Sequence, residues 1–535
     1  MKVSISLRWP LVSIGLGVAV VIAASPMLAA NVTQVVTGKG YEMPAGDFAG
    51  FAPSRPQIEI LTRIPVGDAE LRRIKALPGE PAGNEPAEAP GAGRAAPAAI
   101  KRECRTSDAN GKTPPDIHGA AGPNRLVVVT NSDIGVFSKV DCSILSRVSL
   151  KTLYGAAFAI PDTETLFDPR VIFDARAQRF LTTVDSRSSI STDQFQYFAV
   201  SKNANATSWW LYRIALSEGP DFFCKGTTTT FWDYPSAGKN DHRWFITAND
   251  LGGFRGNGAI LDIDKAPTLD GNPTTAVCFN NLEVNVPPPI VLDSDPNAYF
   301  LSERGFGTGD SIRRYALHTS SAIGGDTLNR GLSDIPIPHW TAPPDAAQPN
   351  GQRLATLDGR FQSATIQVAN RLYNVHAINI DGFARWRLYT FSTDGSTLLR
   401  FTPAVTARAH NFNPSVATGP SASDAKVFVT FSRTIPSGGA AGRAAMLIGI
   451  GPQSSKVGWT FNLIQTSAGE FSNDAFGLSC NDTFRGSCRW GDYSSTQIDP
   501  TRPDRAWGFN ELITRRTLGG AGSQYNWATR ASKGK

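Results

Sequence analysis

The sequence predicts an all-β fold of the β-propeller class, built from repeated groups of short strands. From about residue 125 to residue 530, tight turns rich in Asp, Asn and Pro alternate with short apolar runs, most clearly after Asp168-Pro169 and Asn413-Pro414. A unit of short strands that recurs roughly every 50 to 80 residues cannot bury its own apolar face, so neighbouring units must pack on each other. The 50 Gly, the 36 Pro and the low charged fraction of 18% also suit a turn-rich β-protein.

Counting the starts of these groups predicts seven units, of which the first and the last are incomplete. They begin near residues 125, 165, 232, 289, 361, 411 and 490. Incomplete units at both ends are what ring closure produces when N- and C-terminal strands pair, because closure leaves no exposed edge. We therefore favour seven blades closed in this way, with six blades as the alternative if the end pieces merge.

The chain before the repeats divides into three parts, which leave residues 121–535 for the propeller domain. Residues 1–30 carry Lys2 and Arg8, then an apolar stretch and small residues, the order of a secretory signal. Residues 31–75 are an N-terminal extension with one short helix expected near 68–74, and residues 76–120 are a linker rich in Pro, Ala and Gly. We expect a secreted or periplasmic protein with no membrane span after signal cleavage.

Six cysteines follow the predicted signal. An even number after an export signal favours disulfides over free thiols, although six cysteines allow fifteen connectivities. We predict that sequence neighbours pair: Cys104 with Cys142, Cys224 with Cys278, and Cys480 with Cys488. The spacings match neither a zinc pattern nor a CxxC redox motif.

Charge and motifs exclude several function classes. The formal net charge is +6, but Lys and Arg are spread along the chain, whereas a nucleic-acid binder would concentrate them on one element. No motif predicts a metal or a cofactor, and structural calcium near Asp293 and Asp295 has no EF-hand-like spacing to support it. A Ser-based triad has no G-x-S-x-G elbow behind it.

Four stretches resemble bacterial secreted propellers of the broad sialidase-like group: residues 121–129, 199–202, 233–235 with 245–250, and 489–495. That group often carries an Asp-box, Ser-x-Asp-x-Gly-x-Thr-Trp, as a turn between the outer strands of a blade. Residues 201–209 are a loose version, and residues 392–396 a looser one. The boxes are devices of the fold, so the resemblance implies an exported propeller and no particular activity. The Phe-Arg-Ile-Pro signature of true sialidases is missing, which argues against sialic acid hydrolysis.

In a propeller the innermost strands of successive blades begin around one mouth of the central channel, so side chains far apart in sequence converge there. The residues expected at that mouth are carboxylates, arginines, amides and aromatics, which together can hold a sugar. The candidate catalytic residues are Asp168, Asp233, Asp492 and Tyr493. The candidate ligand-binding residues are Arg170, Trp232, Asp358, Arg360, Asn413, Arg489 and Trp490.

These residues favour a monomeric, exported propeller that binds an extracellular glycan and, as an enzyme, cleaves it. Glycoside hydrolysis needs two carboxyl groups about 5 to 9.5 Å apart, one of them protonated. A polysaccharide lyase would instead use Tyr493 or His376 as a base beside Arg489. The alternative is a non-catalytic secreted or surface protein that presents loops to a partner, with each Asp only capping its own turn. The sequence leaves both interpretations open.

Overall fold

The computed structural model describes most of the chain after residue 31. The described residues are 32–45, 57–58, 68–79, 102–107, 112–218, 221–225, 230–252, 257–304, 307–329, 334–401, 408–420, 426–453, 458–470, 483–484, 487–518 and 522–534. The predicted signal (1–30) and most of the composition-based linker (80–101) therefore lie outside them. Within the described residues, no helix is long and apolar enough to cross a membrane.

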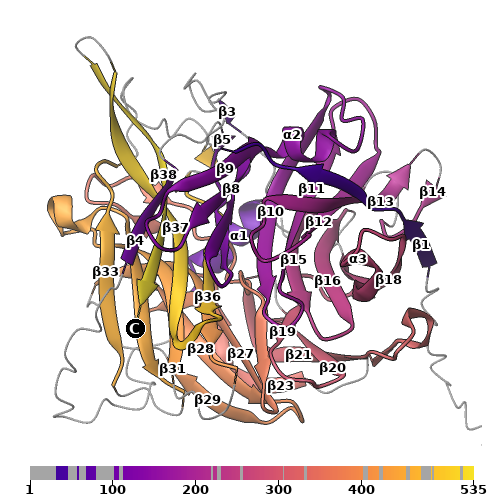
Figure 1. The fold of residues 1–535 in the computed structure, drawn as a ribbon. Coiled ribbons are helices and arrows are strands. Elements are labelled where there is room, and N and C mark those ends of the chain that lie inside the picture. The colour runs from indigo at the N-terminus through magenta and orange to yellow at the C-terminus, as the bar shows by residue number, and fades with distance from the viewer. Residues whose placement is uncertain are drawn as a thin grey trace, which may run out of the picture. The chain divides into compact units, whose positions relative to one another are not determined.

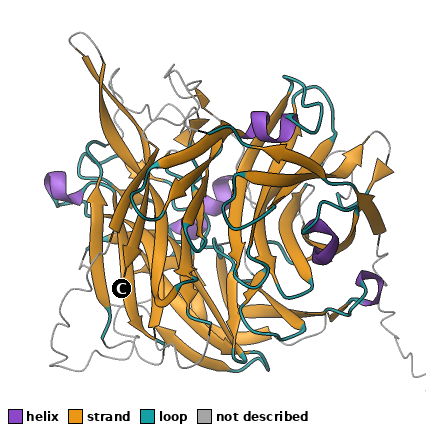
Figure 2. Cartoon of the chain, in the orientation of Figure 1, coloured by secondary structure: helices purple, strands orange, loops and turns teal. Residues whose placement is uncertain are grey.

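Strands dominate the described residues, and helices are few (Figure 2). The helices are α1 (Asp68–Lys75), α2 (Leu150–Gly155), α3 (Lys265–Thr268) and two short 3-10 helices, Ile323–Gly325 and Gly439–Gly442. This agrees with the all-β prediction, because alternating apolar runs and turn residues leave no stretch with an extended helical period.

Groups of antiparallel strands follow one another along the chain (Figure 1). The first group is β6 (His118–Ala121), β7 (Arg125–Val129), β8 (Asp133–Ser138) and β9 (Ile144–Ser149). The second is β10 (Glu164–Asp174), β11 (Arg179–Ser188), β12 (Gln194–Ser201) and β13 (Ser208–Glu218). The third is β15 (Phe231–Lys239), β16 (Arg243–Leu251), β17 (Asn257–Asp264) and β18 (Thr274–Leu282).

The later groups are also antiparallel, although in the fourth β21 pairs with β20, β22 and β23. The fourth is β20 (Asn297–Ser302), β21 (Thr308–His318), β22 (Thr327–Asn329) and β23 (Asp334–Thr341). The fifth is β26 (Thr365–Val368), β27 (Arg371–Ile380), β28 (Phe383–Ser392) and β29 (Thr397–Phe401). The sixth is β30 (His410–Thr418), β31 (Lys426–Thr434), β32 (Ala445–Pro452) and β33 (Thr460–Thr466). The seventh is β36 (Ser495–Asp499), β37 (Arg502–Leu518), β38 (Gly522–Gly534) and β4 (Arg102–Ser107).

The first strands of six of these groups, and a short strand that precedes the fourth group, contact one another in a cycle. β6 contacts β10, β10 contacts β15, and the series continues through β19 (Pro289–Val291), β26, β30 and β36 back to β6. β19 also pairs in parallel with both β15 and β26, which joins the third and fifth groups in one hydrogen-bonded sheet. β15, β19, β26 and β30 are buried along their whole length, as expected for strands covered on both faces.

The seventh group takes its outer strand from near the N-terminus. β4 pairs antiparallel with β38, as Figure 1 shows at the left of the ribbon. Residues 102–107 form this strand, whereas the composition of residues 76–120 predicts a linker there. Within β4, Cys104 and Thr106 are buried while Arg102, Glu103 and Arg105 are exposed, the period-two pattern of a strand with one covered face.

The N-terminal extension also adds strands to the repeated groups. β1 (Val32–Val36) pairs with β18, and β2 (Lys39–Glu42) pairs with β13. Residues 31–535 form one compact unit, so no separate body ends at residue 120. The remaining strands are β3 (Gln57–Ile58), β5 (Lys112–Thr113), β14 (Asp221–Phe222), β24 (Ala346–Ala347), β25 (Arg353–Leu354), β34 (Thr483–Phe484) and β35 (Ser487–Cys488).

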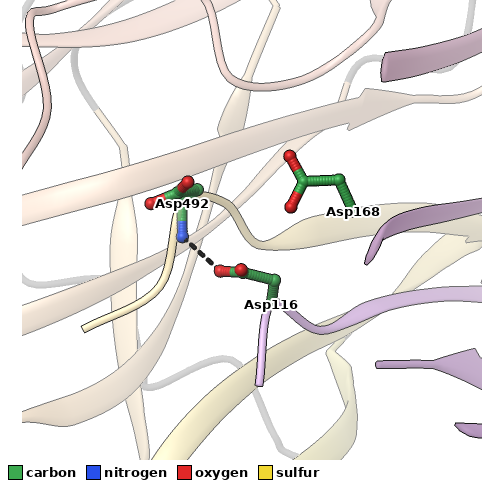
Figure 3. Close-up of side chains that lie close together, drawn as sticks. All are labelled: Asp116, Asp168 and Asp492. Carbon is green, nitrogen blue, oxygen red and sulfur yellow. Dashed lines mark hydrogen bonds between the residues drawn. The ribbon is translucent and has the colours of Figure 1, made fainter. Parts of the chain in front are cut away.

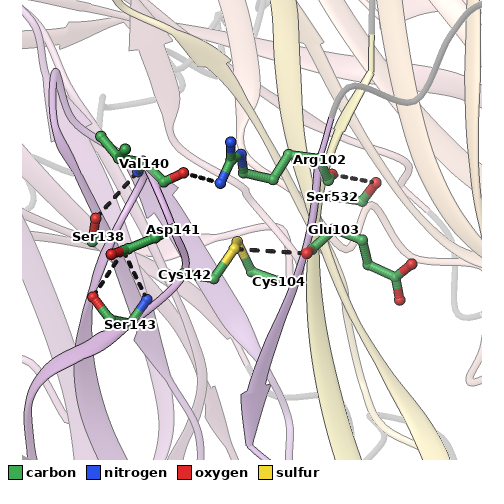
Figure 4. The surroundings of a disulfide bond; sticks show 9 residues. All are labelled: Arg102, Glu103, Cys104, Ser138, Val140, Asp141, Cys142, Ser143 and Ser532. Carbon is green, nitrogen blue, oxygen red and sulfur yellow. Dashed lines mark hydrogen bonds between the residues drawn. A yellow bond between two sulfur atoms is a disulfide. The ribbon is translucent and has the colours of Figure 1, made fainter.

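Two of the predicted disulfides are present. Cys104 on β4 pairs with Cys142 in the turn between β8 and β9, which links the seventh group to the first (Figure 4). Cys224 pairs with Cys278 on β18, which links the second group to the third. The third predicted pair involves Cys480, which lies outside the described residues. Disulfides persist in oxidising compartments, so the two bonds indicate an extracytoplasmic location.

An ion pair lies at the same junction as the first disulfide. Nζ of Lys139, in the β8–β9 turn, is 2.8 Å from Oδ1 of Asp499 at the end of β36. Lys533 on β38 contacts the other oxygen of Asp499. These cations lower the pKa of Asp499 against the opposing effect of burial. The first and seventh groups are therefore joined by charge as well as by a covalent bond.

The two Asp-box-like segments lie at equivalent places in their groups. Residues 202–207 turn between β12 and β13, where Oδ1 of Asn203 accepts a hydrogen bond from the backbone N–H of Asn205. Residues 393–396 turn between β28 and β29, where Asp394 accepts from the N–H of Ser396. Both are the third-to-fourth strand turns of their groups, and both use the local side-chain bond expected of Asn and Asp in turns.

Candidate functional site

Three of the innermost strands contain the same irregularity near their starts. Asp168, Tyr234 and Asn413 each precede a proline, and their φ angles are +51°, +62° and +48°. The pairing register of β10, β15 and β30 shifts at these positions, which marks a β-bulge in each strand. Positive φ is unusual for any residue but glycine and is an outlier for one as bulky as Tyr. Bulges and strained backbone of this kind re-aim side chains and concentrate at functional sites.

A cluster of three carboxylates lies beside these bulges. One carboxylate oxygen from each of Asp116, Asp168 and Asp492 lies within 4.8 Å of the others. Figure 3 shows the carboxyl groups of Asp116 and Asp168 turned toward Asp492. The three residues are only 1%, 5% and 3% exposed. We call this set the carboxylate cluster.

Hydrogen bonds between groups hold the cluster together. The backbone N–H of Asp492 donates to Oδ1 of Asp116 over 2.7 Å, and Nδ2 of Asn131 donates to Oδ2 of Asp116 over 2.7 Å. The carbonyl oxygen of the same Asn131 side chain accepts from the N–H of Asp168 over 2.8 Å. One amide therefore positions two of the three acids.

Burial and mutual repulsion keep protons on the cluster. Burial and the nearby charge of Asp492 raise the pKa of Asp116 to about 7. The pKa of Asp168 lies well above its ordinary value, because the group is buried and faces the charges of Asp116, Asp233 and Asp492. The same causes raise the pKa of Glu511, which faces Asp116 and Asp492. Closely spaced carboxyl groups cannot all ionise in a buried site, so Asp116 and Asp168 hold their protons to higher pH than an exposed Asp does.

Two arginines supply the compensating charge. Nη2 of Arg489 is 3.2 Å from Oδ2 of Asp492. Nε of Arg170 donates to the carbonyl of Pro235 over 2.8 Å, and Nη1 donates to the carbonyl of Gln362 over 3.2 Å. Arg170 thereby joins three of the innermost segments beneath the acids.

Two tyrosines cover Arg170. Its guanidinium carbon lies 3.3 Å from the ring centroid of Tyr493 and 5.1 Å from that of Tyr234. The Tyr493 hydroxyl donates to the carbonyl of Pro169, and the Tyr234 hydroxyl donates to the carbonyl of Asp492. Burial raises the pKa of both phenols. Both tyrosines therefore remain protonated at neutral pH, which makes Tyr493 a poor base or nucleophile.

Most of the other predicted site residues also lie around the cluster. Asp358 forms a 2.8 Å ion pair with Arg360, whose guanidinium lies 4.4 Å from the Tyr234 ring centroid. Nδ2 of Asn413 donates to the carbonyl of Gly491 over 2.6 Å. Asp233 is buried, and its charge raises the pKa of Asp168. The predicted convergence of strand starts thus brings these groups together.

Three candidates instead belong to the protein interior. The indole N–H of Trp232 donates to Gln196, and that of Trp490 donates to Ser432, with both rings fully buried in apolar clusters. His376 contacts the carbonyl of Gly359 and the hydroxyl of Tyr389, and burial lowers its pKa to about 3. These contacts place the two Trp side chains in packing and leave His376 neutral.

Three residues of the site were not predicted from the sequence: Asp116, Asn131 and Gln362. Asp116 fell in the composition-based linker, although Pro115-Asp116 before a short apolar run repeats the turn-then-strand order of the later units. Asn131 and Gln362 act through amide hydrogen bonds, and an amide in a β-rich sequence has no spacing that marks it. Of these three residues, only Asp116 lies in a sequence pattern from which it could have been predicted.

Helix α1 covers the tyrosines beside the cluster. Ile74 is 2% exposed and packs in one apolar cluster with Tyr234, Tyr493, Ala342 and Leu357. The helix is held by an ion pair from Lys75 to Asp345. Just after it, Nδ2 of Asn379 donates to the carbonyl of Leu77 over 3.1 Å. The N-terminal extension therefore closes the side of the site at which the strands begin.

The donor set also bears on metal binding. Three carboxylates are the oxygen ligands that Ca²⁺ and Mg²⁺ prefer, but Ca²⁺ takes 6–8 oxygen ligands. Here Arg489 and Arg170 already sit against the acids, and the pKa of Asp116 and Asp168 is raised. The arrangement fits shared protons and arginine pairing better than a divalent cation.

Comparison with known proteins finds only distant structural similarity. No family model matches the chain, and no curated protein matches it. A chimera of ACO and RPE65 aligns with TM-score 0.37 and 9% identity, over 66% of this chain and 72% of that chain. A Trypanosoma rangeli sialidase aligns with TM-score 0.34 and 8% identity, over 81% and 60%. A GH43 endo-arabinanase from Bacillus licheniformis aligns with TM-score 0.28 and 10% identity, over 55% and 96%. Such distant likeness assigns no activity to this chain.

Proposed function

We propose that this chain is an exported bacterial seven-bladed β-propeller that binds and hydrolyses an extracellular glycan at the carboxylate cluster. Each of the seven strand groups is then one blade, and the cyclic contacts of the first strands surround the axis. The pairing of β4 with β38 supports closure of the ring, with the Cys104–Cys142 disulfide across the junction. The chain acts as a monomer in this proposal.

One observation carries the catalytic part: two acids from different groups lie side by side in opposite electrostatic settings. Asp168 has a strongly raised pKa and is the proton donor, whereas Asp492 lies 3.2 Å from the guanidinium of Arg489 and is the second catalytic carboxyl group. Glycosidases use such a pair, with the carboxyl groups about 5–5.5 Å apart in retaining enzymes and farther apart in inverting ones. The close approach within the cluster favours the retaining type. A lyase is less favoured, because the Tyr493 phenol is held protonated.

Access to the cluster requires movement of α1. The acids are buried, and Ile74 closes the side where a sugar would enter. We therefore expect low activity in the chain as it stands and higher activity when α1 is displaced.

The test is incubation of the purified protein with neutral and uronic polysaccharides, reading new reducing ends and the absorbance of unsaturated products. The full chain and its Ile74→Ala variant are compared, because the variant weakens the α1 contact. Asp168→Asn and Asp492→Asn in the Ile74→Ala background should lose at least about 100-fold in rate. Asp310→Asn, an exposed acid on β21, is the matched control.

A second candidate is a non-catalytic interaction protein whose partner is a surface protein. The burial of the whole carboxylate cluster beneath α1 favours this candidate, because acids that no ligand reaches can have a purely structural role. If neither the full chain nor the Ile74→Ala variant cleaves any polysaccharide of the panel, and neither is retained on an immobilised glycan, the glycan proposal is rejected in favour of this one.

A further inference from the structure

A cavity lies near the ends of the innermost strands, whereas the carboxylate cluster lies near their starts. Its volume is about 120 Å³. The walls are mostly apolar, and the main contributors are Phe173, Ile290, Leu292, Ile366, Ala417 and Ile498. Five of these residues lie on β10, β19, β26, β30 and β36, and Leu292 directly follows β19. An apolar cavity with a few convergent polar groups is the usual form of a small-molecule site.

The charged residues in this wall are both cations. Arg176 and Lys239 line the cavity, and Lys239 is only 3% exposed. Arg176 is paired with Asp241 outside the lining. Lys239 is therefore the group whose charge the cavity must accommodate.

Lys239 shares its carboxylate partner with a second lysine. Its Nζ is 3.6 Å from Oδ1 of Asp174, while Oδ2 of the same carboxylate accepts a 2.7 Å hydrogen bond from Lys265. In the described part of the chain Nζ of Lys239 makes no hydrogen bond shorter than this contact. Two buried lysines thus share one carboxylate, which leaves a surplus positive charge at the cavity wall. A buried cation without a full partner is costly, and a bound anion would relieve that cost.

We propose that this cavity binds a small apolar monocarboxylate, whose carboxylate pairs with Lys239 and whose hydrocarbon part fills the apolar walls. The volume of about 120 Å³ is slightly below the roughly 150 Å³ of an enclosed cavity that admits benzene, so it suits a short acyl chain or at most a single ring. The carboxylate cluster could not hold the same ligand, because its own acids would repel it.

The experiment measures binding of benzoate, benzyl alcohol and benzylamine to the full chain by ligand-observed NMR and calorimetry. We expect benzoate to bind at least about tenfold more tightly than benzyl alcohol, and benzylamine to bind least. This series tests the charge preference without any substitution. Equal affinity for benzoate and benzyl alcohol, or no saturation by benzoate at concentrations of roughly 20 mM, would overturn the proposal.

Two variants then locate the site. Lys239→Met removes the charge at similar length and should reduce benzoate affinity about tenfold while leaving benzyl alcohol unchanged. Lys151→Met, at an exposed position of α2, should change neither affinity. Ala417→Phe fills the cavity and should abolish binding of both. Benzoate affinity that survives both Lys239→Met and Ala417→Phe in folded protein would place the ligand elsewhere and refute the assignment.

Discussion

Asp116 accepts a 2.7 Å hydrogen bond from the backbone N–H of Asp492, although 376 positions separate the two residues. The bond joins the segment before the first strand group to the segment before the seventh. It also couples two acids of the carboxylate cluster, so the geometry of the site depends on how the two ends of the repeated region meet. Substitutions at this junction should therefore change the geometry of the carboxylate cluster.

The protonation of Asp116 predicts a pH dependence of stability. Its folded-state pKa is about 7, against an ordinary value of 3.8, so the native state holds more protons than the unfolded state between these values. Stability from this group is present at low pH and is lost as pH rises toward 7. Asp116→Asn should therefore reduce the difference in unfolding free energy between pH 5 and pH 8 by about 2 kcal/mol. Urea unfolding at several pH values measures this, and an unchanged pH profile would contradict it.

The packing of Ile74 predicts that α1 can be released selectively. Ile74→Ala removes the apolar anchor and should weaken the docking of α1 by about 2–4 kcal/mol. Arg72→Ala changes an exposed residue of the same helix and is the matched control. Hydrogen exchange should rise in α1 and at Tyr493 in the first variant only. Equal exchange in the two variants would show that Ile74 does not hold the helix.

The Cys104–Cys142 bond predicts a local effect at the junction of the first and seventh groups. Cys104→Ser with Cys142→Ser should lower the unfolding free energy by about 2–4 kcal/mol. Exchange protection should fall in β38 and β36, while β16 and β17 keep theirs. The converse double variant, at Cys224 and Cys278, should loosen the second and third groups instead. A uniform loss of protection in both would contradict the local assignment.

Arg170 is predicted to be a structural cation of the site. It bonds to the carbonyls of Pro235 and Gln362 and faces the buried acids, so Arg170→Met leaves negative charge uncompensated. The expected cost is about 3–5 kcal/mol, whereas Arg176→Met, at a half-exposed ion pair, should cost less than about 1 kcal/mol. Denaturant midpoints compare the two. Similar midpoints would mean that Arg170 carries no more than a surface charge.

The sequence pattern predicts the strand starts and several site residues, because the repeated turn has a physical cause. Asp168-Pro169 and Asn413-Pro414 mark bulges at the starts of buried strands, and knowing that such starts converge was enough to gather Asp168, Asp492 and Arg170. The disulfides followed from pairing neighbours in sequence for Cys104 and Cys224.

The rest depended on contacts that no local pattern encodes. β4 is six residues long and finds its partner more than 400 positions away, as the Arg102–Ser532 separation of 430 shows. The burial of Trp232 and Trp490 depends on which face of each strand is covered by its neighbour. The position of α1 over Tyr493 depends on the apolar side chain of Ile74, in a helix in which five of the eight residues are charged.

The placement of β4 has a consequence for the order of biogenesis. β4 precedes every other strand of its sheet in the chain, so that sheet cannot be completed until β38 has been synthesised. Closing a loop of this length is slow compared with forming adjacent hairpins. The Cys104–Cys142 bond needs only the first part of the chain, and can hold β4 beside the early strands until β38 arrives to receive it.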